Sequence, residues 1–212
     1  MVTLIFVRHG FSESNKNNVF TGHLDVPLCD IGYQQAELVS DYLLNNFKID
    51  AIYSSPLCRV IDTIKKVSDT LSIPITIEQD FIEIFGGDWE GMSSTEMKDK
   101  YADYLEKWNS NKGLVPCPNG ESLNDAGQRA MKALSRICPA NDGKTLIIAT
   151  HGGVIRALQC YFLGLSIERI NELDWTPNAS ISIVNYDNGK FTPVKLNLVE
   201  HLKGLTTIIK NF

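Results

Sequence analysis

Two short apolar runs, each followed by a histidine and a glycine, constrain the fold of this chain more than any other feature. Residues 3–7 (TLIFV) lead directly into Arg8 and His9, and residues 145–149 (TLIIA) lead, one residue later, into His151. Runs of apolar and β-branched residues that are bounded by turn residues are typical of buried strands. In an open α/β sheet, ligands collect at the carboxyl ends of the strands. The sequence therefore predicts that both histidines lie at one edge of one sheet.

The remaining segments alternate between strand and helix patterns. Further strands are expected at residues 50–54, 75–77, 180–186 and 191–198, the last two joined by an Asp-Asn-Gly turn. Helices are expected from an Asp30 N-cap through Leu43, from a Ser55 N-cap and Pro56 through Leu71, within residues 93–108, from Ser122 through Ile137, and from about Gly153. This alternation predicts an α/β fold, a three-layer α/β/α sandwich with a mostly parallel central sheet. We expect one domain over residues 1–212, with a small helical insertion at about 88–120 that serves as a lid.

Composition and charge argue against several classes of protein. Of the 212 residues, 43% are hydrophobic and 21% are charged, and the formal net charge of -5 argues against a nucleic-acid-binding surface. Apolar runs fall short of the ~20 residues of a membrane span, and Met1 leads straight into the first strand, so a cytoplasmic protein is expected. The five cysteines are odd in number and form no CxxC pair, which predicts neither a disulfide framework nor a zinc site. The last two predicted strands form a hairpin that is either a free edge of the sheet or a contact between subunits, so the sequence is compatible with a homodimer.

A set of cationic, imidazole and carboxylate side chains falls near the ends of the predicted strands. The set is Arg8, His9, Asn15, Arg59, Glu83 and His151. Arg59 lies in the first turn of a predicted helix, where the helix dipole disfavours a cation unless an anion is bound. Glu83 stands among apolar residues, so its carboxylate must be hydrogen-bonded, paired or protonated. Together these groups suit phosphoryl transfer, and two arginines would repel the divalent cation that two histidines and a carboxylate otherwise suit.

Six motifs follow one another between residues 4 and 153. They are residues 8–15 (RHGFSESN), 21–22 (TG), 54–59 (SSPLCR), Glu83 with 87–91 (GDWEG), 119–122 (NGES) and 151–152 (HG). In this order they resemble the histidine phosphatase superfamily, which includes the cofactor-dependent phosphoglycerate mutases and has the same layered fold. The resemblance implies that His9 is the nucleophile that becomes phosphohistidine and that Glu83 is the general acid and base. It further implies a phosphate pocket formed by Arg8, Asn15, Thr21, Gly22, Arg59, His151 and Gly152.

The pKa values of the two reacting groups should be shifted in the directions that this chemistry requires. The two arginines should lower the pKa of His9, which favours the neutral imidazole whose lone pair attacks. Apolar neighbours should keep Glu83 protonated until it donates its proton to the leaving group.

The resemblance leaves the reaction open. A metal-independent phosphomonoester hydrolase passes the phosphoryl group from histidine to water, whereas a 2,3-bisphosphoglycerate-dependent phosphoglycerate mutase passes it to a second hydroxyl. Two features favour a hydrolase without a cofactor that acts on a small phosphorylated metabolite: Phe11 stands where the mutases commonly have Glu, and the insertion is short. Residues 15–22, in contrast, resemble the mutase pattern. A non-catalytic phosphate-binding protein is the third possibility, but binding alone needs neither His9 nor Glu83. Side chains expected to line or cover the pocket are Phe11, His23, Phe85, Trp89 and residues 101–118.

Overall fold

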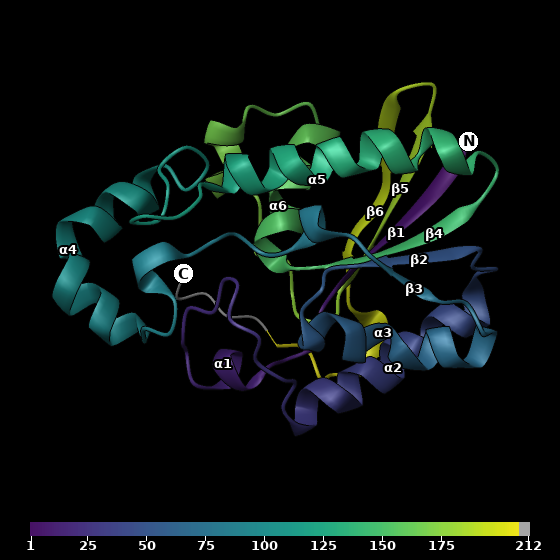
Figure 1. Ribbon diagram of the computed structural model, residues 1–212, viewed down its shortest axis with the longest axis horizontal. Helices are drawn as coiled ribbons and strands as arrows, with labels where there is room; N and C mark the ends of the chain where they lie inside the picture. The colour runs from purple at the N-terminus through teal and green to yellow at the C-terminus, as the bar shows by residue number, and fades with distance from the viewer. Residues whose placement is uncertain (208–212) are drawn as a thin grey trace.

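The computed structural model describes residues 1–207 and contains a six-stranded sheet between two layers of helices (Figure 1). The strands are β1 (Val2–Arg8), β2 (Ala51–Ser54), β3 (Ile75–Ile77), β4 (Thr145–Thr150), β5 (Ile181–Asp187) and β6 (Lys190–Leu198). Their order across the sheet is β3-β2-β4-β1-β5-β6. Strands β3, β2, β4 and β1 are parallel, whereas β5 runs antiparallel to β1 and to β6. The predicted α/β sandwich with a mostly parallel sheet is confirmed.

The helices cover both faces of this sheet. The α-helices are α1 (Glu13–Lys16), α2 (Asp30–Asn46), α3 (Cys58–Leu71), α4 (Ser94–Ser110), α5 (Leu123–Ile137) and α6 (Gly152–Phe162). The 3-10 helices are η1 (Gln79–Phe81), η2 (Gly87–Trp89), η3 (Pro139–Asn141), η4 (Ile167–Glu172) and η5 (Glu200–Leu202). Helices α5 and α6 lie on one face, and α2 and α3 lie on the other (Figure 1).

Strand β1 shows why the first apolar run has no polar alternation. Leu4 and Phe6 belong to the core cluster on the α5 and α6 side, whereas Ile5 and Val7 belong to the cluster on the α2 and α3 side. A central strand that is covered on both faces must be apolar on both. The run therefore ends where the strand leaves the core, and the polar Arg8 and His9 come at the carboxyl edge of the sheet.

Residues 88–120 extend beyond this edge, and α4 lies away from the sheet (Figure 1). Tyr101 has a non-helical backbone (φ -132°, ψ 31°), so α4 consists of two helical pieces joined at a kink, as the pattern allows. The segment adds aromatic residues to the core cluster on the α5 and α6 side, and the ring centroids of Trp89 and Trp108 are 5.3 Å apart. We call residues 88–120 the helical insertion; its role as a lid stays a prediction.

Several helix ends differ from the sequence prediction. Helix α2 begins at Asp30 with Cys29 at its N-cap, and α3 begins at Cys58 with Leu57 at its N-cap, so neither Asp30 nor Ser55 is a cap. The short helix α1 was not predicted, and Ser12 caps it through a reciprocal pair of bonds with Asn15. Within residues 1–207, no helix combines the length and the apolar character that crossing a bilayer requires.

Candidate active site

The two histidines of the apolar runs lie side by side because β1 and β4 pair in parallel. Arg8 is in register with Thr150, and the His9 amide donates a hydrogen bond to the Thr150 carbonyl at 3.1 Å. His151 directly follows β4 as the N-cap of α6, and its ring centroid lies 5.2 Å from that of His9. Both side chains are buried, His151 completely. Parallel pairing therefore brings together two groups that are 142 positions apart in the sequence.

The His9 imidazole is held in one orientation. Its Nδ1 lies 2.7 Å from the carbonyl oxygen of Gly10. Because a carbonyl only accepts, Nδ1 carries the proton, and in the neutral ring the lone pair is then on Nε2. Burial lowers the pKa of His9 well below its ordinary value, and the positive charges of Arg59 and Arg8 lower it further. The direction of this pKa shift agrees with the sequence prediction, but burial contributes more to it than the two arginines do.

Arg8 and Arg59 supply the positive charge of the site. Arg59 donates from Nη1 to the Leu24 carbonyl at 2.8 Å and from Nη2 to the Gly22 carbonyl at 2.9 Å, which fixes the guanidinium plane. Arg8 donates from Nη1 to the carbonyl of Thr176. Burial lowers the pKa of Arg8 to about 10 and also lowers that of Arg59, while Glu83 opposes both shifts. A pKa of about 10 leaves Arg8 charged near neutral pH.

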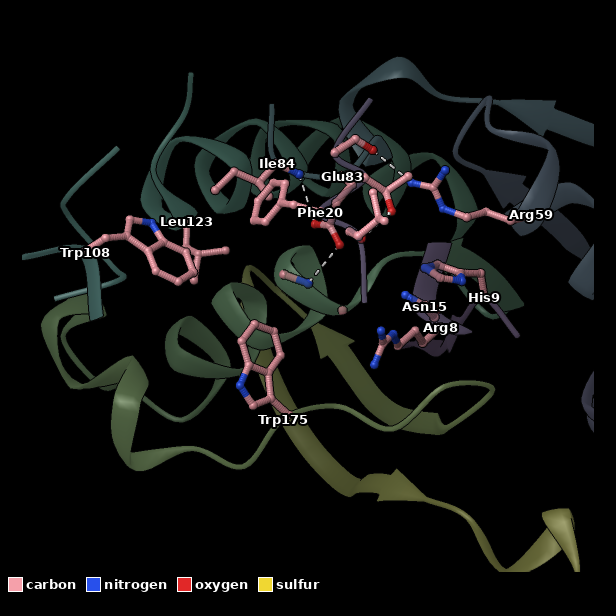
Figure 2. A pocket seen from close by; sticks show the side chains of 15 residues that line it. Arg8, His9, Asn15, Phe20, Arg59, Glu83, Ile84, Trp108, Leu123 and Trp175 are labelled. Carbon is pink, nitrogen blue, oxygen red and sulfur yellow. Dashed lines mark hydrogen bonds between the residues drawn. The ribbon is translucent and has the colours of Figure 1, made fainter. Parts of the chain in front are cut away.

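These side chains line one cavity, which has a polar and an apolar end. The polar lining is Arg8, His9, Asn15, Thr21, Gly22, Arg59, Glu83, Gly152 and Gly153, and the apolar lining is Val19, Phe20, Ile84, Trp108, Leu123 and Trp175. In Figure 2, Arg8, His9 and Asn15 lie on the side opposite Trp108 and Leu123. His151 lies behind His9 and is not part of the lining. Arginine and amide donors, the groups that bind phosphate in proteins, converge at the polar end.

The Glu83 carboxylate is fixed by two backbone amides. Oε1 accepts from the amide of Ile84 at 2.9 Å, and Oε2 accepts from the amide of Gly153 at 3.2 Å (Figure 2). The backbone carbonyl of Glu83 is held from the other side by Arg129 Nη2 at 2.6 Å and by His23 Nε2 at 2.8 Å. Glu83 thus lies in an irregular segment after η1, half-buried rather than in a strand.

The glycine pair at the start of α6 makes room for two of the charged groups. A Cβ atom on Gly152 would lie 3.0 Å from Cζ and Nε of Arg8, and one on Gly153 would lie 2.6 Å from Oε1 of Glu83. The lack of a side chain at these two positions therefore lets Arg8 and Glu83 approach the backbone of α6.

Asn178 is a site residue that the sequence analysis missed. Its Nδ2 donates to Oδ1 of Asn15 at 2.9 Å and lies 3.3 Å from the carbonyl oxygens of both His9 and Gly10. The amide of Ser12 also donates to Oδ1 of Asn15, at 3.3 Å. Since the oxygen of Asn15 is occupied in this way, its NH₂ group is left to face the cavity as a donor.

Ser55 and Arg129 were also missed as supports of the site. The Oγ atom of Ser55 lies 2.7 Å from Nε2 of His151, so the hydroxyl predicted to cap a helix holds an imidazole instead. Arg129 on α5 donates to the carbonyls of Asp80, Ile82 and Glu83, which fixes the segment that carries the carboxylate. In the sequence, Arg129 stands out as an arginine on an otherwise apolar helix face. That feature alone is only weak evidence for a role in the site.

The residues expected to line the pocket fall into two groups. Phe11, His23 and Phe85 lie outside the cavity lining. Trp89 is completely buried in the core, where its ring packs on those of Phe20 and Trp108. Those two neighbours do line the cavity.

Known proteins resemble this chain over nearly its whole length. Residues 4–199 match the family model of the histidine phosphatase superfamily (branch 1). Phosphoserine phosphatase 1 of Hydrogenobacter thermophilus is 31% identical over 95% of this chain and 95% of its own length. A 2,3-bisphosphoglycerate-dependent phosphoglycerate mutase of Methanococcus vannielii is 31% identical over 82% of this chain and 86% of its own length. The solved structure of Bacillus stearothermophilus YhfR has a TM-score of 0.90 and 28% identity, over 95% of this chain and 100% of that one. The chain therefore belongs to the histidine phosphatase superfamily.

Proposed function

We propose that this chain is a metal-independent phosphomonoester hydrolase that forms a phosphohistidine on His9. The observation that carries the proposal is the neutral, buried imidazole of His9, whose Nδ1 proton is bound by Gly10. Its Nε2 lone pair is available in a cavity that two arginines also line. A nucleophile beside fixed positive charge is what phosphoryl transfer requires.

In the first step, His9 Nε2 attacks phosphorus and the phosphorus–oxygen ester bond breaks. Arg8, Arg59 and the NH₂ group of Asn15 stabilise the charge that spreads over the equatorial oxygens. His151 lies outside the cavity lining and supports the nucleophile, since its ring centroid is 5.2 Å from that of His9. Glu83, in its protonated form, donates a proton to the leaving oxygen, which departs as an alcohol.

In the second step, water attacks the phosphohistidine and the phosphorus–nitrogen bond breaks. Glu83 is now ionised and takes the proton of the attacking water, which returns both residues to their starting state. Phosphate leaves, and no metal ion takes part. The two arginines support this part of the proposal, since a divalent cation beside them would be repelled.

A phosphoglycerate mutase is the second candidate function. The mutase relative matches this chain at the same identity as the phosphoserine phosphatase, 31% in both cases. The phosphatase match spans more of both chains, which favours hydrolysis. We propose a small phosphorylated metabolite as substrate and a cytoplasmic location.

A turnover assay in chelator-treated buffer separates these functions. p-Nitrophenyl phosphate and 3-phosphoglycerate are supplied in parallel, with and without 2,3-bisphosphoglycerate. We expect phosphate release without bisphosphoglycerate and little conversion to 2-phosphoglycerate. Bisphosphoglycerate-dependent isomerisation would make the chain a mutase, and activity that returns only with added metal would refute the metal-free mechanism. His9→Ala should abolish phosphate release, and turnover by that variant would refute the nucleophile assignment.

A further inference from the structure

A second cavity lies next to the one over His9, and Trp175 lines both. The first cavity has a volume of about 90 Å³, well below the ~300–1,000 Å³ of common ligand pockets. The second has a volume of about 750 Å³. A substrate that is much larger than its phosphoryl group would therefore extend beyond the first cavity when that group lies at His9. The Arg8 hydrogen bond to Thr176, the residue after Trp175, ties the wall between the cavities to the phosphate end.

Two cations line the second cavity with aromatic rings as their neighbours. Lys112 Nζ lies 4.6 Å from the ring centroid of Trp108 and 5.4 Å from that of Trp175, and Arg156 Cζ lies 4.5 Å from the Trp175 centroid. Arg156 is 3% exposed; its Nε and Nη2 donate to the Leu173 carbonyl, whereas Nη1 is buried and has no partner among the described residues. Within residues 1–207, neither cation forms an ion pair.

The positive charge of this cavity is only partly compensated by the protein. Burial lowers the pKa of Lys112 to about 8, and repulsion by Arg156 contributes to the shift. Holding two like charges partly out of water with a single exposed carboxylate beside them costs free energy, and a bound anion would offset that cost. Asp174, which is exposed, lines the same cavity. Two cations and one carboxylate leave one uncompensated positive charge, which matches a monoanion better than a second phosphate.

From this arrangement we infer that the second cavity receives a carboxylate of the substrate, bound by Lys112 and Arg156, while the phosphoryl group lies at His9. The inference rests on the proposed hydrolase function and names its substrate class: small phosphomonoesters that also carry a carboxylate. Lys112 is then a residue that determines specificity, since it comes from the helical insertion and takes no part in phosphoryl transfer. Trp108 and Trp175 hold its ammonium group in place through cation–π contacts.

A matched pair of ligands tests the inference. 3-Phosphoglycerate has a carboxylate where glycerol 3-phosphate has a hydroxymethyl group, and p-nitrophenyl phosphate reports hydrolysis alone. We expect Lys112→Met, which keeps an apolar stem over the rings, to raise KM for 3-phosphoglycerate about tenfold, the loss of one charge-assisted contact. Its kcat, and the KM values for the other two substrates, should change less than twofold. Lys112→Arg should restore the preference, and Lys107→Met, at an exposed position on α4, is the matched control.

Equilibrium binding separates this inference from the proposed function. In a His9→Ala background, where hydrolysis is blocked, calorimetry should show 3-phosphoglycerate binding about tenfold more tightly than glycerol 3-phosphate. Lys112→Met should remove that difference. Equal binding of the two ligands, or an equal loss for both in Lys112→Met, would refute the carboxylate site and leave Lys112 as a structural contact of the insertion. Failure to hydrolyse p-nitrophenyl phosphate would refute the hydrolase and leave the binding result to decide the carboxylate site.

Discussion

The substitution Gly153→Ala should damage proton transfer while leaving phosphate binding intact. The new Cβ would lie 2.6 Å from Oε1 of Glu83 and 3.0 Å from a methyl carbon of Leu123. To reach an ordinary contact of 3.4 Å, the carboxylate must move by roughly 0.8 Å, and a displacement of about 1 Å at a catalytic group can cost about 100-fold in rate. Alanine is compatible with the start of a helix, so the fold should not be the cause of the loss.

The leaving group reveals whether the loss is one of acid catalysis. An alkyl phosphate needs a proton on its departing oxygen, whereas p-nitrophenolate departs without one. We expect kcat/KM for glycerol 3-phosphate to fall about 10- to 100-fold and that for p-nitrophenyl phosphate to fall about threefold or less. Inhibition by inorganic phosphate should be unchanged.

The neighbouring substitution, Gly152→Ala, is the matched control. Its Cβ would meet Arg8 at 3.0 Å and should weaken inhibition by phosphate for all substrates alike. Equal losses for both leaving groups in Gly153→Ala would refute the assignment of Glu83 as the acid. Unchanged rates would refute the view that Gly153 makes room for its carboxylate.

Three further predictions test the supports of the site. Ser55→Ala removes the hydroxyl that bonds His151, so kcat/KM should fall about tenfold while the melting temperature changes little; full activity would mean that packing alone orients the imidazole. Asn178→Ala frees the side chain of Asn15, so the inhibition constant of inorganic phosphate should rise about tenfold, and an unchanged constant would argue against this role. Because burial depresses the pKa of both His9 and His151, the unfolded chain binds protons below pH 6.5 that the folded chain does not. The free energy of unfolding should therefore fall by about 1 kcal/mol for each of these two histidines between pH 7 and pH 5.5, measured by urea denaturation. His9→Ala should remove the share of the slope that comes from His9, whereas His201, whose pKa is also lowered by burial, contributes to the slope in both proteins.

The sequence predicted the sheet and much of the cavity lining because both rest on strong local signals. An uninterrupted apolar run is required of a strand covered on both faces, so residues 3–7 and 145–149 were recognisable as central strands. Helix ends were less predictable, since a serine before a proline is typical of an N-cap. Here the Ser55 hydroxyl contacts His151 instead, 96 residues away, and no local pattern contains that partner.

The sequence by itself determined the layered fold and the candidate reacting groups with their order along the chain, because each depends on residue type and on short-range periodicity. The tertiary structure decided which other side chains hold those groups in place. Asn178 lies just before β5, which runs antiparallel to β1. The first residue of β5, Ile181, therefore pairs with Val7, close to His9 in the chain. The amino-terminal end of β5 therefore lies at the same edge of the sheet as the carboxyl ends of the parallel strands. The alternation of strands and helices in the sequence does not predict this arrangement. The positions of Arg129, Lys112 and Trp175 follow in the same way from packing between segments distant in the sequence, since such contacts form only when the whole chain folds.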